Sequence, residues 1–155
     1  MTTDKSGTAT DRHGDGGTAV NCDATENRET ARDETRLEHH DITRQVIAAF
    51  YVVRRELGIG LPETVYANAM AVVLRRAGLE AKREAYVEMI FWGVVVGKGR
   101  IDVLVENKVI VEIKVLPKID DRTRTQTIGY LRASKLHVGM ILNFGSDSGF
   151  VRVVG

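Results

Sequence analysis

The sequence predicts one folded domain in which helices cover a mixed β-sheet, in the α/β or α+β class. Residues 42–57 and 62–77 place apolar side chains three and four positions apart, which is the period of an amphipathic helix. Between residues 80 and 115 the pattern changes to β-branched runs with a period of two, which is typical of strands. A further helical segment, residues 120–134, precedes two more apolar runs, so helices and strands are interleaved along the chain.

Polar residues dominate the first 40 positions, where apolar side chains are almost absent. Such a segment cannot offset its ordering entropy by burial, so we expect residues 1–40 to form a disordered tail and residues 41–155 to fold. Residues 1–41 carry 10 acidic and 5 basic residues (5 − 10, net −5), and residues 42–155 carry 11 acidic and 17 basic residues (17 − 11, net +6). A basic domain suits a polyanionic partner, although an ordinary solvated surface explains this charge equally well.

The sequence favours a cytoplasmic protein. Its single cysteine, Cys22, excludes an internal disulfide framework, as expected in a reducing compartment. The chain does not open with the charged and then apolar pattern of a signal peptide. The longest apolar run, Ile47–Val53, is far shorter than the roughly 18 residues that span a bilayer, so we expect no membrane segment.

Caps and turns set the expected boundaries. Asp41 stands where the N-cap of the first helix is expected, and Pro62 is expected at the first position of the second helix. Asp120 or Asp121 is expected to cap the third helix. The remaining elements are expected as strands at residues 80–85, 87–92, 94–96, 137–144 and 150–154, the last at a sheet edge, with a turn at Gly97-Lys98-Gly99.

The most informative stretch is residues 100–115, which reads as a β-hairpin around the turn Glu106-Asn107-Lys108. A three-residue turn pairs Val105 with Val109. Since a slip of one residue would move every side chain to the opposite face, only an odd loop keeps the two apolar faces together. One face is then expected to collect the apolar residues Ile101, Val103, Val105, Val109, Val111, Ile113 and Val115.

The other face of this hairpin carries the charged residues. The same register sets Asp102 opposite Glu112, with Cβ atoms about 4.5–5.5 Å apart, and Lys114 lies two residues further on. Two like charges repel at that distance unless a proton or a cation lies between them. Alternating acids and lysines are also typical of an exposed sheet face, which explains the pattern without any site.

Two observations favour a site over an exposed face. Leu104 and Ile110 share the charged face, and the strands are apolar elsewhere, as in strands that are covered on both sides. Carboxylates on a covered face need a partner, because an unpaired buried charge is costly. A divalent cation would supply that partner, and oxygen ligands favour Mg²⁺ or Mn²⁺ over zinc.

Two further polar residues have both structural and functional interpretations. Glu63 lies in the first turn of the second helix, where the helix dipole favours a negative charge; alternatively, it points toward the sheet from the border of the buried face. Gln126 shares a face of the third helix with Arg122 and Tyr130 and is either an ordinary exposed residue or part of a site.

Five motifs in order resemble the GxxExxY protein family, a member of the PD-(D/E)XK nuclease-like superfamily. The resemblance covers about residues 42 to 153 and implies a restriction-endonuclease-like core. The motifs are Gly60-Leu61-Pro62-Glu63-Thr64-Val65-Tyr66, Arg100-Ile101-Asp102, Val111-Glu112-Ile113-Lys114, Gln126 with Tyr130-Leu131, and Ile141-Leu142-Asn143-Phe144-Gly145.

The resemblance implies a role for each residue of the predicted site. Asp102 and Glu112 would bind Mg²⁺ or Mn²⁺ together with the backbone carbonyl of Ile113, and Glu63 would complete the shell or help to hold a second ion. Lys114 would orient the attacking water and offset negative charge. In addition, Gln126 would position the water or the phosphate.

Substrate contacts are expected around this centre. Arg100, Arg122 and Arg124 would contact the phosphate backbone, which positions nucleic acid without reading its sequence. Tyr66 would border the site as a substrate contact, or would pack or hydrogen-bond to Glu63.

Two functions follow from the resemblance. The first is a metal-dependent nuclease that hydrolyses phosphodiester bonds in DNA or RNA. The alternative is a catalytically inactive nuclease-fold module that binds nucleic acid or a protein partner. We expect no attached recognition domain, so any sequence specificity would come from a homodimer or another partner.

Overall fold

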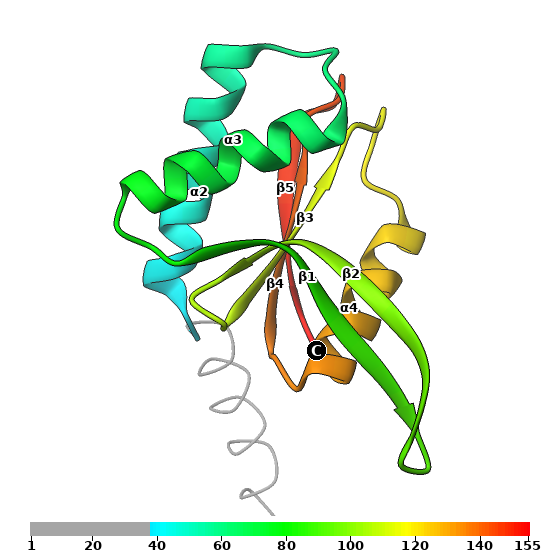
Figure 1. Ribbon diagram of the computed structural model, residues 1–155. Helices are drawn as coiled ribbons and strands as arrows, with labels where there is room; N and C mark the ends of the chain where they lie inside the picture. The colour runs from blue at the N-terminus through cyan, green and yellow to red at the C-terminus, as the bar shows by residue number, and fades with distance from the viewer. Residues whose placement is uncertain (1–37) are drawn as a thin grey trace, which may run out of the picture.

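The computed structural model describes residues 38–155, and Figure 1 shows their arrangement. The predicted tail therefore lies almost wholly outside the described residues, as does Cys22. The mixture of helices and a mixed sheet confirms the predicted α+β class. The elements in chain order are α2 (His40–Leu57), α3 (Glu63–Arg76), β1 (Ala81–Phe91), β2 (Val94–Val105), β3 (Val109–Lys114), α4 (Asp121–Ser134), β4 (Val138–Asn143) and β5 (Gly149–Val154).

The five strands form one sheet in the order β1-β2-β3-β4-β5. Only β3 and β4 are parallel, because α4 connects them as a crossover; the other neighbours are antiparallel. Strand β5 lies at an edge of the sheet, as predicted. Strand β3 is therefore central, with β2 on one side and β4 on the other.

Each face of the sheet has its own apolar core. Helices α2 and α3 cover one face, where Phe50, Tyr66 and Met70 pack on the sheet, and α4 covers the other with Tyr130 and Leu131 (Figure 1). The larger core also contains, from strands β2, β3 and β4, Val103, Val105, Val109, Val111, Ile113, Val138, Met140 and Leu142. Among residues 38–155, no helix is long and apolar enough to cross a membrane.

The predicted hairpin turn is confirmed. Val105 pairs with Val109, and Val103 pairs with Val111 across β2 and β3. The Lys108 N–H donates to the Val105 carbonyl at 2.9 Å, which closes the turn. The β2–β3 pairing extends only from Val103 to Val105 on β2, so the two strands separate where Asp102 begins.

The predicted place of Ile101 is wrong. Ile101 packs with Val87 and Tyr130 on the α4 side, whereas Val103 belongs to the core under α2 and α3. The reason lies in the neighbouring strand. Glu84 falls between the pairs Arg83–Val103 and Ala85–Ile101 and has a φ of 54°, which interrupts the pleat opposite Asp102.

Several predicted boundaries also need correction. His39, not Asp41, is the N-cap of α2, and Asp41 lies in its first turn. Pro62 is the N-cap of α3 rather than its first helical residue. Asp120 caps α4 as predicted, because its Oδ1 accepts a hydrogen bond from the Thr123 N–H at 2.8 Å.

The predicted turn at Gly97-Lys98-Gly99 is also wrong, because these residues continue β2 and pair with Met89, Glu88 and Val87 of β1. The chain reverses earlier, at Trp92 and Gly93, whose φ values are 49° and 80°. Position 99 has no room for a side chain, because the ring of Tyr130 lies against the Gly99 backbone and a Cβ would overlap the ring. The predicted strands at residues 80–85 and 87–92 are therefore one strand, β1.

Candidate active site

Asp102 lies where β2 parts from β3, and its side chain bridges the gap. Its Oδ2 accepts a hydrogen bond from the Ile113 N–H at 2.8 Å. Its own carbonyl accepts a hydrogen bond from the Arg83 guanidinium. The positive φ of Glu84, opposite Asp102, re-aims the strand at this position, as irregularities beside functional sites often do. The structure thus fixes the Asp102 carboxylate against the end of β3.

The Ile113 backbone is placed to join this carboxylate. In a strand, the N–H and C=O of one residue point to the same side, which is why antiparallel partners exchange both bonds. The Ile113 N–H points to Asp102, so its carbonyl also points toward β2, beyond the end of the β2–β3 pairing. This arrangement supports the predicted role of the Ile113 carbonyl as an oxygen ligand.

Glu112 is the most unusual residue of the sheet, because it is a carboxylate with only 3% of its surface exposed. Its Oε2 lies 3.5 Å from the Lys114 Nζ, while its Oε1 is buried and has no hydrogen-bond partner. Burial is the main cause that raises the pKa of Glu112 to about 7; the charge of Asp102 also raises it, and Lys114 acts in the opposite direction.

The unpartnered oxygen fits a cation. A buried oxygen without a partner is costly, and a divalent ion between Asp102 and Glu112 would satisfy it and offset their repulsion. Among residues 38–155, no three His, Cys, Asp or Glu side chains gather as a metal site. The residues that could hold an ion here are Asp102, Glu112 and, through its backbone carbonyl, Ile113.

Glu63 also lies at this end of β3, but its carboxylate binds backbone there. Its Oε1 accepts a hydrogen bond from the Val115 N–H at 3.0 Å, directly after Lys114. The bond joins the first turn of α3 to the end of the central strand. Glu63 does not form a three-carboxylate group with Asp102 and Glu112, so its metal role stays a prediction.

Tyr66 is a core residue, so the packing alternative holds, whereas a substrate contact or a hydrogen bond to Glu63 is not what the structure shows. Its side chain is fully buried and its ring stacks on Phe144 with centroids 4.3 Å apart. Its hydroxyl donates to the Gly58 carbonyl at 2.9 Å and accepts from the Leu61 N–H at 3.2 Å. Tyr66 therefore fixes the α2–α3 connector.

The Gly60, Glu63 and Tyr66 motif thus has a structural explanation. Gly60 adopts a φ of 95°, which turns the connector and which side chains rarely tolerate. The tyrosine holds the connector to the start of α3, and the glutamate holds that start to the end of β3. The three residues together place the first turn of α3 beside the candidate site.

Gln126 approaches the site from α4. Its side-chain amide donates to the Tyr130 hydroxyl at 2.9 Å, and the Tyr130 ring packs against Gly99 of β2, three residues before Asp102. Gln126 is exposed and Tyr130 is buried, so the hydrogen bond between them links the surface of α4 to the packing against β2. The site prediction omitted Tyr130, although its spacing from Gln126 on the helix pointed to it.

Asn143 is a second residue that the site prediction missed. Its side chain is fully buried at the end of β4 and exchanges two hydrogen bonds of 2.9 Å with the Leu116 backbone. It also binds the Asp147 carbonyl and the Gly145 N–H. Asn143 therefore fixes the segment that leaves β3, and a buried polar residue ending an apolar run was the signal for it.

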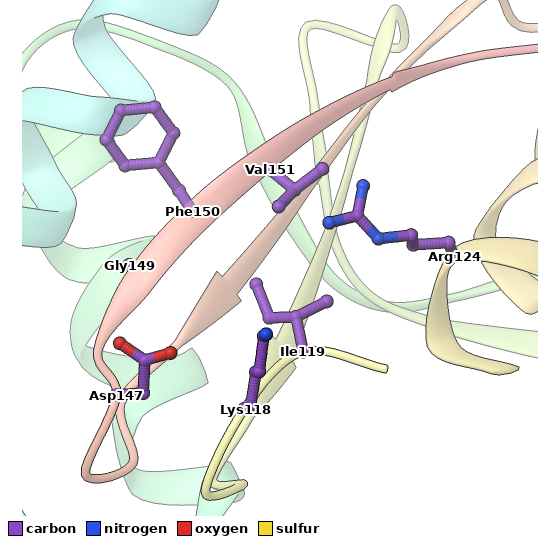
Figure 2. A pocket seen from close by; sticks show the side chains of 7 residues that line it. All are labelled: Lys118, Ile119, Arg124, Asp147, Gly149, Phe150 and Val151. Atoms are coloured by element: carbon purple, nitrogen blue, oxygen red, sulfur yellow. The ribbon is translucent and has the colours of Figure 1, made fainter. Parts of the chain in front are cut away.

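The predicted phosphate contacts are dispersed around the site. Arg100 lies 3.6 Å from Glu84 in an exposed ion pair, and Arg122 is exposed on α4. Arg124 lines a pocket of about 170 Å³ with Lys118 and Asp147 (Figure 2). Figure 2 shows Arg124 extending from α4 toward Val151, while Lys118 lies beside Ile119 on the segment that follows β3.

Comparison with known proteins gives a family. A family model described as the PD-(D/E)XK nuclease superfamily matches residues 40–153. A solved structure described as the crystal structure of SSO0001 is similar, with 21% identity and a TM-score of 0.47, over 58% of this chain and 48% of that chain. This chain therefore spans about half of that protein. The search of curated proteins gave no match.

Proposed function

Since the chain belongs to the PD-(D/E)XK nuclease superfamily, we propose that it is a Mg²⁺- or Mn²⁺-dependent nuclease that hydrolyses phosphodiester bonds of DNA or RNA. The observation that carries the proposal is the buried Glu112 oxygen without a partner, beside Asp102 and Lys114. A structural salt bridge would leave no such oxygen, whereas a metal ligand must keep one available.

Asp102, Glu112 and the Ile113 carbonyl would hold the ion. An ion held there lowers the pKa of a coordinated water and stabilises negative charge on the phosphate. The Ile113 N–H fixes the Asp102 carboxylate, so the ligand is already oriented before an ion arrives. Glu63 anchors the segment after Lys114 and so keeps the lysine backbone in place. We also propose that Glu63 binds this ion directly or helps to hold a second ion.

Lys114 would act on the water and the phosphate. Its side chain is 19% exposed and its ammonium lies between a buried carboxylate and solvent, so it can donate to an incoming oxygen without losing contact with Glu112. Opposite it, Gln126 and Tyr130 would offer hydrogen bonds to the same phosphate. Neighbouring phosphates would be contacted by Arg100 and Arg122 and by the pair Lys118 and Arg124. Figure 2 shows this pair in the pocket that it lines.

The test is cleavage of plasmid DNA, single-stranded DNA and RNA by the full chain, with Mg²⁺, with Mn²⁺ and with chelator. We expect metal-dependent cleavage that Asp102→Asn reduces by at least about 10²-fold. Asp41→Asn, on the exposed side of α2, is the matched control and should leave the rate unchanged. Absence of cleavage with either metal, or full activity of Asp102→Asn, would contradict the proposal.

Metal titration separates the nuclease from an inactive module. Calorimetry should detect Mn²⁺ binding that Glu112→Ala abolishes. Nucleic-acid binding that weakens with salt but needs no metal, in a protein without cleavage, would instead support the inactive binding module.

A further inference from the structure

The β1–β2 hairpin ends in an exposed apolar tip. We define the distal arm as residues 89–97, with the sequence Met-Ile-Phe-Trp-Gly-Val-Val-Val-Gly, which contains no charged residue. Trp92 is 90% exposed, and five other apolar side chains are between 45% and 65% exposed: Ile90, Phe91, Val94, Val95 and Val96. In Figure 1 the hairpin extends away from the rest of the molecule.

No helix among residues 38–155 covers this arm. Met89 packs partly against the core under α4, but the six exposed residues belong to neither core. Phe91 and Trp92 stack on each other with centroids 4.6 Å apart. Two aromatic side chains of about 150–250 Å² each, exposed to this extent, give roughly 220–370 Å² before the four aliphatic residues are added. This patch is at or above the size that monomers usually expose.

The charges around the arm decide between two kinds of partner. Nucleic acid would need cations at the tip, but the nearest two, Lys98 and Arg100, lie 3.3 Å from Glu88 and 3.6 Å from Glu84 in ion pairs. The tip itself is uncharged. An apolar surface therefore fits it better than a phosphate backbone.

We propose that the distal arm binds the distal arm of a second copy of this chain in a two-fold symmetric dimer. In a two-fold interface residue i contacts residue j of the partner and j contacts i, and only residues near the axis meet their own copies, so a charge near the axis would face a like charge. A surface of nine uncharged residues avoids that repulsion. The flanking residues Glu88 and Lys98 neutralise each other in an ion pair of 3.3 Å, so the base of the arm adds no net charge that would repel its copy.

The backbone adds to the fit. Strand β1 has β2 on one side only, so the outer edge of its distal half offers backbone groups for antiparallel pairing. A stable interface buries about 800 Å² per partner. The apolar tip supplies part of that area, and the strand edge would add to it. The inference goes beyond the proposed function and does not depend on it, because the arm lies outside the residues that would hold the ion.

Trp92 makes the interface measurable, since it is the only tryptophan of the chain. The experiment combines sedimentation equilibrium of the full chain with tryptophan emission and acrylamide quenching over the same concentration series. We expect dimerisation, a blue shift and weaker quenching along one common binding curve. A monomer throughout the series would overturn the proposal, as would a dimer whose tryptophan emission does not change.

Variants locate the contact. Trp92→Asp should weaken the dimer by about tenfold or more, and aspartate tolerates the positive φ of this turn position. Val94→Lys should do the same and keeps the tryptophan as a probe. Ile59→Asp changes an equally exposed apolar residue outside the arm and should leave the dimer intact. Circular dichroism checks that each variant is folded.

Two outcomes of the variant series would overturn the proposal. The first is a dimer that persists in both Trp92→Asp and Val94→Lys. The second is a monomeric chain whose Trp92 emission is quenched by a short DNA duplex, with Val94→Lys weakening that response. In the second case the arm binds nucleic acid rather than a second copy.

Discussion

Strand β3 presents one side to α2 and α3 and the other to α4, and only the α4 side carries charge. Val109, Val111 and Ile113 are fully buried in the larger core. On the α4 side, Ile110 is equally buried, but Glu112 and Lys114 follow it. Both sides of the strand are covered. The α2–α3 side is wholly apolar, whereas the α4 side ends in Glu112, whose carboxylate has one oxygen without a hydrogen-bond partner.

The difference between the two sides of β3 separates residues that stabilise the fold from residues that we propose for the site. Apolar residues on the α2–α3 side contribute by burial, and their loss leaves cavities. A buried carboxylate contributes little to stability and usually costs some, so a half-paired one is typical of a functional site. Four predictions test this division, from the largest expected effect to the smallest.

Removing the Lys114 ammonium should affect activity most. Lys114→Ala is expected to lower kcat by about 10²–10³-fold, because the amine would act on charge that develops in the reaction. The melting temperature should also fall at pH 8, because Glu112 loses its ionic partner, and should change less at pH 5, where Glu112 retains a proton. Lys108→Ala, in the exposed turn of the same hairpin, is the control. Comparable loss of activity in both variants would contradict a specific role for Lys114.

Truncating the other side of β3 should do the reverse. Ile113→Ala keeps the backbone carbonyl but removes a fully buried side chain, and is expected to lower the free energy of unfolding by about 2–5 kcal/mol. Urea denaturation measures the loss. Mn²⁺ affinity of the folded fraction should remain near that of the unaltered protein. A stability change below that range would mean that the side relaxes without a cavity.

Glu112→Gln should make stability less dependent on pH. The pKa of Glu112 is raised from 4.5 to about 7 by burial, so between these values the folded metal-free protein retains a proton that the unfolded chain has lost. Stability therefore falls as pH rises through this window, by about 3 kcal/mol in total, and stays low above it.

Denaturation at pH 5 and pH 8 without metal measures this effect. The glutamine variant should approach or exceed the unaltered protein in stability at pH 8, and Mn²⁺ should stabilise only the unaltered protein. Equal pH profiles for the two proteins would show that Glu112 does not titrate in this range.

Glu63→Gln should produce the smallest change. Its Oε1 accepts the Val115 N–H, and glutamine keeps an acceptor but loses the charge, so we expect about 1 kcal/mol of destabilisation. Calorimetric titration with Mn²⁺ tests whether Glu63 is also a metal ligand. Unchanged Mn²⁺ affinity would limit Glu63 to anchoring α3 on β3, whereas a loss of affinity comparable to that in Glu112→Ala would make it a ligand.

The local parts of this protein could be predicted from the sequence. The helix stripes, the Asp120 cap, the Val105–Val109 register and the charged side of the hairpin all depend on neighbours in the chain or on one turn. The misplaced Ile101 and the false turn at residues 97–99 share another cause. Each depends on another element. Ile101 is displaced by the kink at Glu84 of β1, the strand that pairs with β2, and residues 97–99 stay in the strand with the Tyr130 ring of α4 packed against Gly99.

The sequence by itself predicted the hairpin register, Val105 with Val109, because an odd turn keeps the two apolar faces together; the ladder ends at Val103 and Val111, so Asp102 lies near Glu112 but is not paired with it. Only the tertiary structure decided that one Glu112 oxygen is buried without a partner, that Tyr66 is a core residue, and that Glu63 anchors to Val115. Periodicity assigns a side chain to a face. Burial and pairing depend on which element covers that face, and the periodicity of the hairpin does not say how α3 or α4 packs on it.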